Sequence, residues 1–178
     1  MTENRFVVIE GLFKKRENGI IENHHIIISD ESIYLIKSST NYGEYVKSLF
    51  SGIGELIGIA GDGIGFFLGE LASEITGDKF FKILKSHSKK SSKRYITKIL
   101  ENLDEIAAKN NGITKIQFQD INELILKRGY ILNGKSYIEI NQNELKIKLY
   151  SKTNETISEL IKTLKSTQSK IKIKTKFI

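Results

Sequence analysis

Basic side chains are the residues of this sequence best suited to chemistry, because lysine and arginine donate charge-assisted hydrogen bonds to phosphate oxygens. The chain of 178 residues carries a formal charge of +7. Eight lysines or arginines and no acid lie between Lys79 and Lys98, whereas five acids and no base lie between Gly52 and Asp78. The two arms either pair electrostatically with each other or leave bases free to face an anionic surface. These bases are Lys85, Lys89, Lys90, Lys93 and Arg94.

A serine-rich run within this basic tract, residues 86–93, predicts a loop. A polybasic loop beside an apolar helix is typical of a peripheral membrane contact, where each base near an anionic leaflet contributes about 1 kcal/mol. A solubilising loop between two helices is the other interpretation.

Catalytic and metal-binding chemistry finds little support in the sequence. The histidines are His24, His25 and His87. Neighbouring side chains on a strand point to opposite faces, so His24 and His25 cannot hold one metal ion together. The chain contains no cysteine, no phosphate-binding loop ending in Gly-Lys-Ser/Thr and no Gly-x-Ser-x-Gly turn. Asp120 fits a turn cap better than a catalytic base. We therefore expect no catalytic residue, no metal and no cofactor.

A glycine-rich apolar segment, residues 49–77, carries eight of the fourteen glycines. At about 100° per residue, five glycines fall on one helical stripe. Each glycine inside a helix lowers the stability of the helix by about 1 kcal/mol relative to alanine. Close packing against a second helix usually compensates for this loss. The segment therefore predicts helix packing and a homo-oligomer. The stripe consists of Gly54, Gly58, Gly61, Gly65 and Gly69.

Asp62 argues against this segment crossing a membrane. Nine Ile, Leu and Phe residues between positions 53 and 71 contribute roughly 3–5 kcal/mol to insertion, whereas a central aspartate costs about 2.5–3.5 kcal/mol. A lone spanning helix is therefore unfavourable. Asp62-Gly63 is also typical of a turn. The segment therefore forms either one helix or a hairpin of two short helices.

Short strands separated by turn dipeptides make up most of the remaining chain. Asn18-Gly19, Asn111-Gly112 and Asn133-Gly134 mark such turns. The predicted strands are Arg5–Phe13, Ile20–Ile28, Ile33–Ile36, Ile113–Phe118, Glu123–Tyr130, Ser136–Ile140 and Glu144–Tyr150. A helix capped by Thr153 or Asn154 is expected to follow. Its apolar stripe consists of Ile157, Leu160, Ile161 and Leu164.

This order of elements resembles the bacterial pleckstrin-homology-like (PH-like) domains. His25–Ile36 looks like the strand–turn–strand that opens such domains, and Ile116–Ile121 looks like their entry into the fourth strand. Some bacterial members carry a glycine-rich helical insertion between the third and fourth strands, where residues 40–111 lie. The resemblance implies a single α+β domain. Residues 5–38 and 112–168 would form a seven-stranded antiparallel barrel with a C-terminal helix and an inserted helical hairpin.

The resemblance also implies an anion site in the loop between the first two strands, where lipid-binding PH domains hold phosphates with basic side chains. The candidates are Lys14, Lys15 and Arg16, with His24 beside them. A solvated hairpin tip is the other interpretation. The chain has no tryptophan, whereas the C-terminal helix of eukaryotic PH domains usually carries one. Phosphoinositide specificity therefore does not follow from the resemblance.

The basic C-terminal tail, residues 169–178, alternates lysine with apolar residues. Strand periodicity places Ile171, Ile173, Thr175 and Phe177 on one face and the lysines on the other. The tail either adds a strand to its own sheet, adds one to the sheet of a neighbour, or remains a disordered basic tail.

These features predict a non-enzymatic interaction or scaffold module that self-associates through the glycine stripe, contacts anionic membrane surfaces peripherally and binds protein partners. The amino terminus lacks the layout of a secretory signal, so a cytoplasmic location is expected. The alternative is a nucleic-acid-binding protein that uses residues 79–98 and the basic tail. Aromatic side chains interleaved on a basic sheet face, which single-strand binders normally use, are not expected, so nucleic acid is the less favoured partner.

Overall fold

The computed structural model describes residues 6–45, 75–88, 93–129, 135–143, 145–151, 153–167 and 173–177. The strands are β1 (Val7–Lys15), β2 (Ile21–Ile28), β3 (Ser32–Lys37), β4 (Ile113–Gln117), β5 (Glu123–Arg128), β6 (Tyr137–Gln142), β7 (Leu145–Ser151) and β8 (Ile173–Phe177). The helices are α4 (Gly77–Ser88), α5 (Lys93–Lys109), α6 (Asn154–Thr167) and the 3₁₀ turn η1 (Phe118–Asp120). The predicted α+β class, the seven antiparallel strands and the C-terminal helix are confirmed.

The strands form one sheet in the order β4-β3-β2-β1-β7-β6-β5-β8. The sheet is not closed, because β4 and β8 stand at its two ends. Strand β8 belongs to the basic tail and runs parallel to β5, in register from Leu124 with Ile173 to Arg128 with Phe177. Of the alternatives for the tail, a strand added to its own sheet is the one observed.

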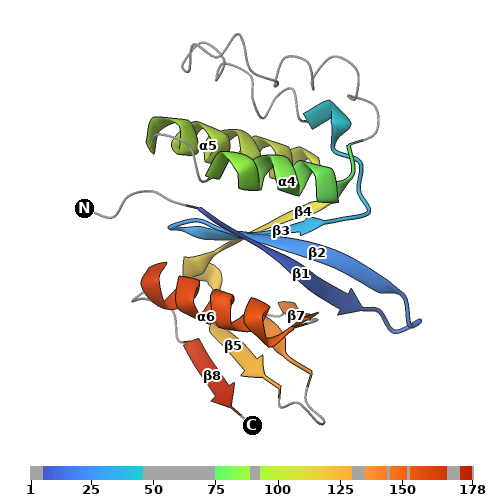
Figure 1. Ribbon diagram of the computed structural model, residues 1–178, viewed down its shortest axis with the longest axis vertical. Coiled ribbons are helices and arrows are strands. Elements are labelled where there is room, and N and C mark those ends of the chain that lie inside the picture. The colour runs from blue at the N-terminus through green and yellow to red at the C-terminus, as the bar shows by residue number, and fades with distance from the viewer. Residues whose placement is uncertain are drawn as a thin grey trace.

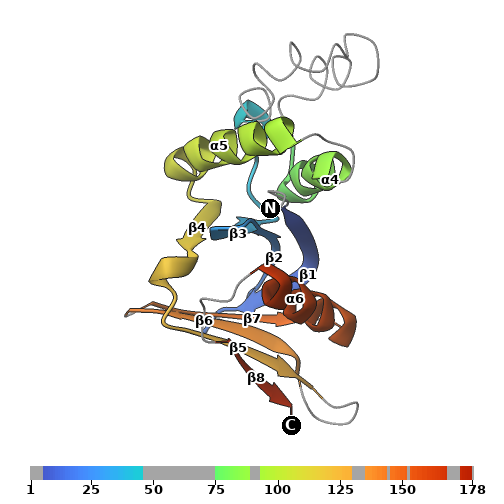
Figure 2. The same ribbon diagram turned by 90° about the vertical axis from the view of Figure 1, so that its left-hand side faces the viewer.

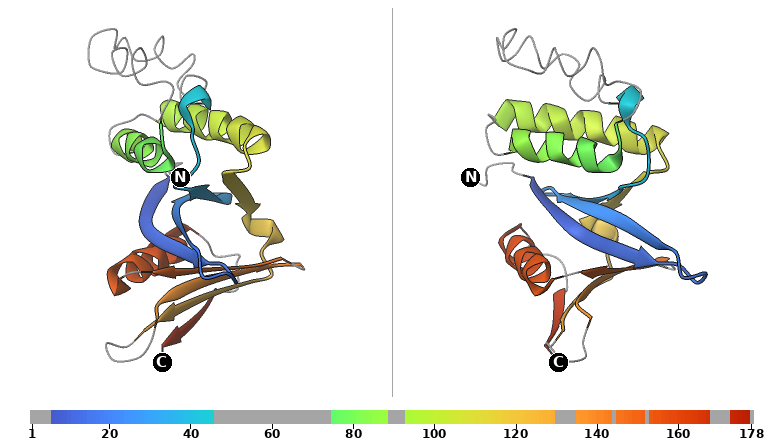
Figure 3. Two further views of the ribbon diagram at one scale, coloured as in Figure 1. Left: turned by 90° about the vertical axis from the view of Figure 1, so that its right-hand side faces the viewer. Right: turned by 45° about the vertical axis from the view of Figure 1, so that its right-hand side comes forward.

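Strand β1 connects two halves of the sheet, the β1–β4 half and the β5–β7 half. It pairs with β2 along most of its length but with β7 only through Leu12 with Ser151 and Phe13 with Tyr150. An irregularity between Ile9 and Leu12 contains Gly11 at φ +86°, a conformation that glycine adopts without strain. Figure 3 shows β1, in dark blue, running from beneath α4 and α5 down to the strands of the β5–β7 half.

Helices α4 and α5 cover one face of the β1–β4 half, and a first hydrophobic core fills the space between them (Figure 1). Because the two helices are amphipathic, each turns an apolar stripe to the sheet. The strands contribute Val8, Ile27, Tyr34, Ile36 and Ile113, and the helices contribute Phe80, Phe81, Leu84, Ile99, Leu103 and Ile106. The insertion between the third and fourth strands therefore contributes much of the core.

A second core lies between the two halves of the sheet, with α6 along one side (Figure 2). Strands of both halves enter it, with Ile26, Ile28, Ile33, Leu35, Leu124, Leu126, Ile138, Ile140 and Leu149. From α6 come Ile157, Leu160 and Leu164, with Ile161 partly buried, so the predicted stripe is confirmed. The cap is Thr153, whose hydroxyl accepts the Thr156 N–H at 3.3 Å.

Candidate functional site

The five glycines of the predicted stripe lie in segment 46–74, outside the described residues. The structure does describe the residues on either side of this segment, 41–42 and 75–76, and we call them its attachment point. Asn41 and Thr76 form an antiparallel bridge, and the Tyr42 N–H donates to the Ile75 carbonyl at 2.7 Å. Residues 41–42 and 75–76, on either side of segment 46–74, therefore lie next to each other.

Buried contacts hold this attachment point firmly. The Tyr42 ring is fully buried and stacks on Phe80 with centroids 4.8 Å apart. Its hydroxyl donates to the Gly112 carbonyl at 2.8 Å, and burial raises the pKa of Tyr42 to about 12, so it remains a neutral donor. The Gly77 N–H lies 3.0 Å from the carbonyls of both Ser38 and Thr40. The base of segment 46–74 is thus part of the first core.

The predicted anion site at the β1–β2 hairpin is only partly available. Arg16 contacts Glu22 at 2.6 Å, and Lys37 contacts the same carboxylate at 2.7 Å. These two cations lower the pKa of Glu22 to about 2, with Arg16 as the larger cause. Lys14 and Lys15 are exposed, and neither forms an ion pair with another described residue. The hairpin therefore offers two free lysines, and Arg16 is already neutralised.

His24 is the residue expected beside these bases. It is half-buried on β2, and neither ring nitrogen has a hydrogen-bond partner among the described residues. Burial lowers its pKa, so the ring is predominantly neutral near pH 7. A neutral, half-buried imidazole adds no charge for binding phosphate.

The predicted basic tract is divided between α4 and α5. Lys89 and Lys90 lie outside the described residues, and Lys93 and Arg94 begin α5. Lys85 contacts Glu10 of β1 at 2.6 Å, and Lys98 lies 3.5 Å from Glu101. Lys79 and Lys82 are exposed on α4. Two bases of the tract are therefore already paired with acids outside the acidic arm.

A histidine, a serine and an aspartate meet where α4 packs on β2, without the geometry of a catalytic triad. The Nε2 atom of His25 lies 2.6 Å from Asp78 and 3.0 Å from Ser38 Oγ, while Nδ1 is buried and has no partner among the described residues. A proton relay needs one partner on each nitrogen. The His25 ring also stacks on Phe81, with centroids 4.1 Å apart. This cluster ties the insertion to the sheet.

Other chemistry is also poorly supported. A shallow hollow of about 490 Å³ lies between α5 and β4. Its one carboxylate, Asp104, accepts from Tyr34 at 2.7 Å and contacts Lys115 at 2.7 Å, so it is already engaged. No cluster of three metal-ligating side chains occurs within the part of the chain that the structure describes.

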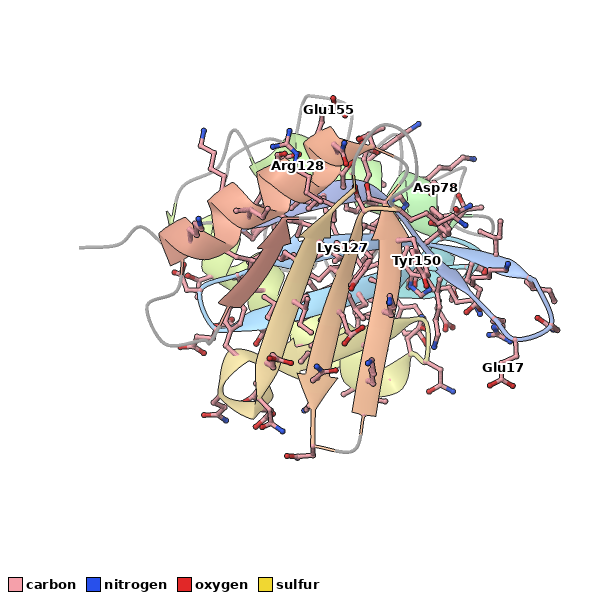
Figure 4. The ribbon with its side chains drawn as sticks, turned by 90° about the horizontal axis from the view of Figure 1, so that it is seen from below. Glu17, Asp78, Lys127, Arg128, Tyr150 and Glu155 are labelled. Carbon is pink, nitrogen blue, oxygen red and sulfur yellow. The ribbon has the colours of Figure 1, made fainter. Side chains whose placement is uncertain are left out.

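The outer face of the β5–β7 half combines aromatic rings with lysines, and we call it the aromatic–lysine face. Tyr150 of β7 lies between two rings, 5.7 Å from Phe13 of β1 and 6.2 Å from Tyr137 of β6 between centroids. Lys148 Nζ lies 3.9 Å above the Tyr137 ring, and Lys127 Nζ lies 5.9 Å from it. Figure 4 looks onto this face, with Lys127 and Tyr150 labelled.

One buried acid on this face, Glu139, is neutralised by lysines. Lys146 contacts one of its oxygens at 2.9 Å and Lys148 contacts the other at 3.6 Å. Burial acts to raise the pKa of Glu139, but the two lysines outweigh it and hold the pKa below its usual value. Two lysines therefore share one carboxylate at this end of the face, beside half-buried rings.

This face overturns the expectation that aromatic side chains are not interleaved with bases on a sheet. The local signal was present, because Lys146, Lys148 and Tyr150 alternate with apolar residues on β7, and Tyr137 and Glu139 do so on β6. The sequence does not show that Phe13 pairs with Tyr150 and that Tyr150 pairs with Tyr137.

No protein-family model, curated protein or solved structure matches this chain. None of the helices within the described residues is long and apolar enough to cross a membrane.

Proposed function

We propose that this protein is a non-enzymatic scaffold module with a PH-like architecture, which self-associates through its glycine-rich insertion. Seven antiparallel strands followed by a helix support the PH-like assignment, as does the position of the insertion between β3 and β4. The open ends of the sheet, β4 and β8, are the departure from a closed barrel.

The attachment point of segment 46–74 carries this proposal. The two ends of segment 46–74 are joined by the hydrogen bond between Tyr42 and Ile75, and both residues are buried in the first core. Glycines on one helical stripe favour close packing with a second helix. A second copy of this chain supplies the matching stripe, so the expected assembly is a homo-oligomer.

Contact with an anionic membrane surface is the second part of the proposal. Lys79 and Lys82 are exposed on α4, which begins close to the attachment point. Lysines near an anionic leaflet each contribute about 1 kcal/mol, and salt weakens this attraction. The protein would then be cytoplasmic and associate with the membrane peripherally.

A non-enzymatic role is supported by how the polar groups are used. Both hydrogen-bond partners of His25 contact the same ring nitrogen, Nε2, so the ring does not connect two groups. The carboxylate of Asp104 is already engaged by Tyr34 and Lys115. Nucleic-acid binding is the second candidate function, and the aromatic–lysine face is the observation that favours it.

Replacing residues 46–74 with a short glycine–serine linker tests the proposal, because the bridge between Asn41 and Thr76 lets a few residues join the ends. We expect an unchanged melting transition and a smaller assembly by light scattering, whereas sedimentation with anionic vesicles should persist because Lys79 and Lys82 remain in this variant. Gly65→Leu in the full chain should reduce the assembly in the same way, because a leucine keeps the two helices apart. An assembly of unchanged stoichiometry in both variants would exclude self-association through the glycine stripe.

A further inference from the structure

We propose that the aromatic–lysine face binds single-stranded nucleic acid. Bases would stack on Tyr137 and Tyr150, and the phosphates would lie beside Lys127 and Lys148. This inference goes beyond the scaffold role and gives the second candidate function its site, on the half of the sheet that α4 and α5 do not cover.

The arrangement of the rings supports base stacking. Phe13, Tyr150 and Tyr137 come from the neighbouring strands β1, β7 and β6 and form one row across the sheet. All three rings are half-buried, so each is held by its neighbours and still exposes part of its surface. Every nucleobase has a π face, so such a row accepts single strands with little dependence on sequence.

The charges around the rings suit a phosphate backbone. Lys127 Nζ lies 5.9 Å from the centre of the Tyr137 ring, and Lys148 Nζ lies 3.9 Å above the same ring, where a base that stacks on Tyr137 would displace it toward the phosphates. The carboxylate of Glu139 is already neutralised by Lys146 and Lys148. The whole chain carries a charge of +7, which favours the approach of a polyanion.

The position of the face favours a single strand over a membrane. α6 and the second core lie on the other side of β5, β6 and β7, and no other described helix or strand covers the outer face in Figure 4. The aromatic rings lie half-buried against neighbouring rings and strands. Insertion into lipid requires apolar side chains that project from the surface, whereas stacking requires rings presented on a flat face.

Fluorescence anisotropy with labelled oligothymidylate and oligouridylate of about ten nucleotides tests this proposal. The comparison probes are an abasic oligomer with the same number of phosphates, a duplex of equal length and anionic phosphatidylserine vesicles. We expect binding to both single strands, at least about tenfold weaker binding to the abasic oligomer, and quenching of tyrosine fluorescence by the single strands.

Matched variants separate stacking from folding and from charge. Tyr137→Phe with Tyr150→Phe keeps both π faces and should bind as the wild type does, whereas Tyr137→Leu with Tyr150→Leu should bind at least about tenfold more weakly. Lys127→Gln should reduce the slope of log affinity against log salt by about 0.7. Lys82→Gln, the same change on the exposed side of α4, should leave the slope unchanged.

The proposal is overturned if the abasic oligomer binds as well as oligothymidylate, or if the Phe and Leu double variants bind equally. It is also overturned if the vesicles bind and the oligonucleotides do not, or if neither binds. Loss of binding in Lys82→Gln but not in Lys127→Gln would move the site to α4 and reject this face.

Discussion

The two halves of the sheet differ in how many of their faces are covered by the protein itself. In the β1–β4 half, Ile27 faces the core beneath α4 and α5, and the adjacent Ile26 faces the core beside α6. In the β5–β7 half, Ile138 is buried in the second core, and the adjacent Tyr137 lies on the outer face. One half is therefore buried between two layers, and the other has one face that no other described helix or strand covers.

This difference assigns separate tasks to the two halves. The β1–β4 half holds the attachment point of segment 46–74, through hydrogen bonds of Ser38, Tyr42 and Gly77. The β5–β7 half carries the aromatic–lysine face. Because β1 belongs to both pairings, the same strand supports the insertion and contributes Phe13 to the other surface.

Truncating one phenylalanine in the first core and one on the aromatic–lysine face should give the largest contrast. Phe81 is fully buried against β2, whereas Phe13 is half-buried on the outer face. We expect Phe81→Ala to lower the free energy of unfolding by about 3–5 kcal/mol, and Phe13→Ala by about 1 kcal/mol through the loss of its cross-strand partner Tyr150. Urea denaturation measures both values. Similar losses would show that α4 is no more integral to the fold than the outer face.

Adding one methyl group to a glycine should lower the stability more next to the attachment point than at a solvated turn. A Cβ on Gly77 would lie 2.5 Å from the Lys37 carbonyl oxygen and 2.7 Å from the Ser38 Cα, so backbone would have to move. We expect Gly77→Ala to cost about 1–3 kcal/mol. Gly19→Ala meets no atom within 4 Å, and its φ of +82° makes about 1 kcal/mol of strain the expected cost. Thermal melts compare the stabilities of the two variants. Equal losses of stability would mean that the backbone of residues 37–38 moves away from the added methyl group with little strain.

Local patterns were sufficient for most of the fold. The turn at Asn18-Gly19 forms where expected, with Gly19 at φ +82°. Such a turn could be predicted because it depends on the types of two neighbouring residues alone. The run Ile33–Ile36 also marked a strand, but its continuous apolar character has a cause that only the structure supplies, namely burial on both faces.

Pairing between distant segments was not predictable in the same way. Alternation of lysine and apolar residues indicates a strand at Ile173–Phe177, yet it does not say that the strand runs parallel to β5. The candidate surfaces show the same limit. Arg16 appeared free in the sequence because nothing there indicates that it meets Glu22 across the hairpin, and the aromatic row forms only when β1, β7 and β6 are adjacent.

The smallest expected effect concerns Glu22, the acid of the β1–β4 half that corresponds to Glu139 in the other half, since each is held by two bases. Its pKa falls from 4.5 to about 2 on folding, so its stabilisation is fully present above pH 4.5 and is lost as the pH falls toward 2. Because Arg16 is half-exposed and solvent screens the pair, we expect Glu22→Gln to cost up to about 1 kcal/mol at pH 7. The difference from the wild type should shrink below pH 4.5 and vanish near pH 2, as measured by urea denaturation across that range. A difference that does not change with pH would show that Glu22 acts by packing and not by its charge.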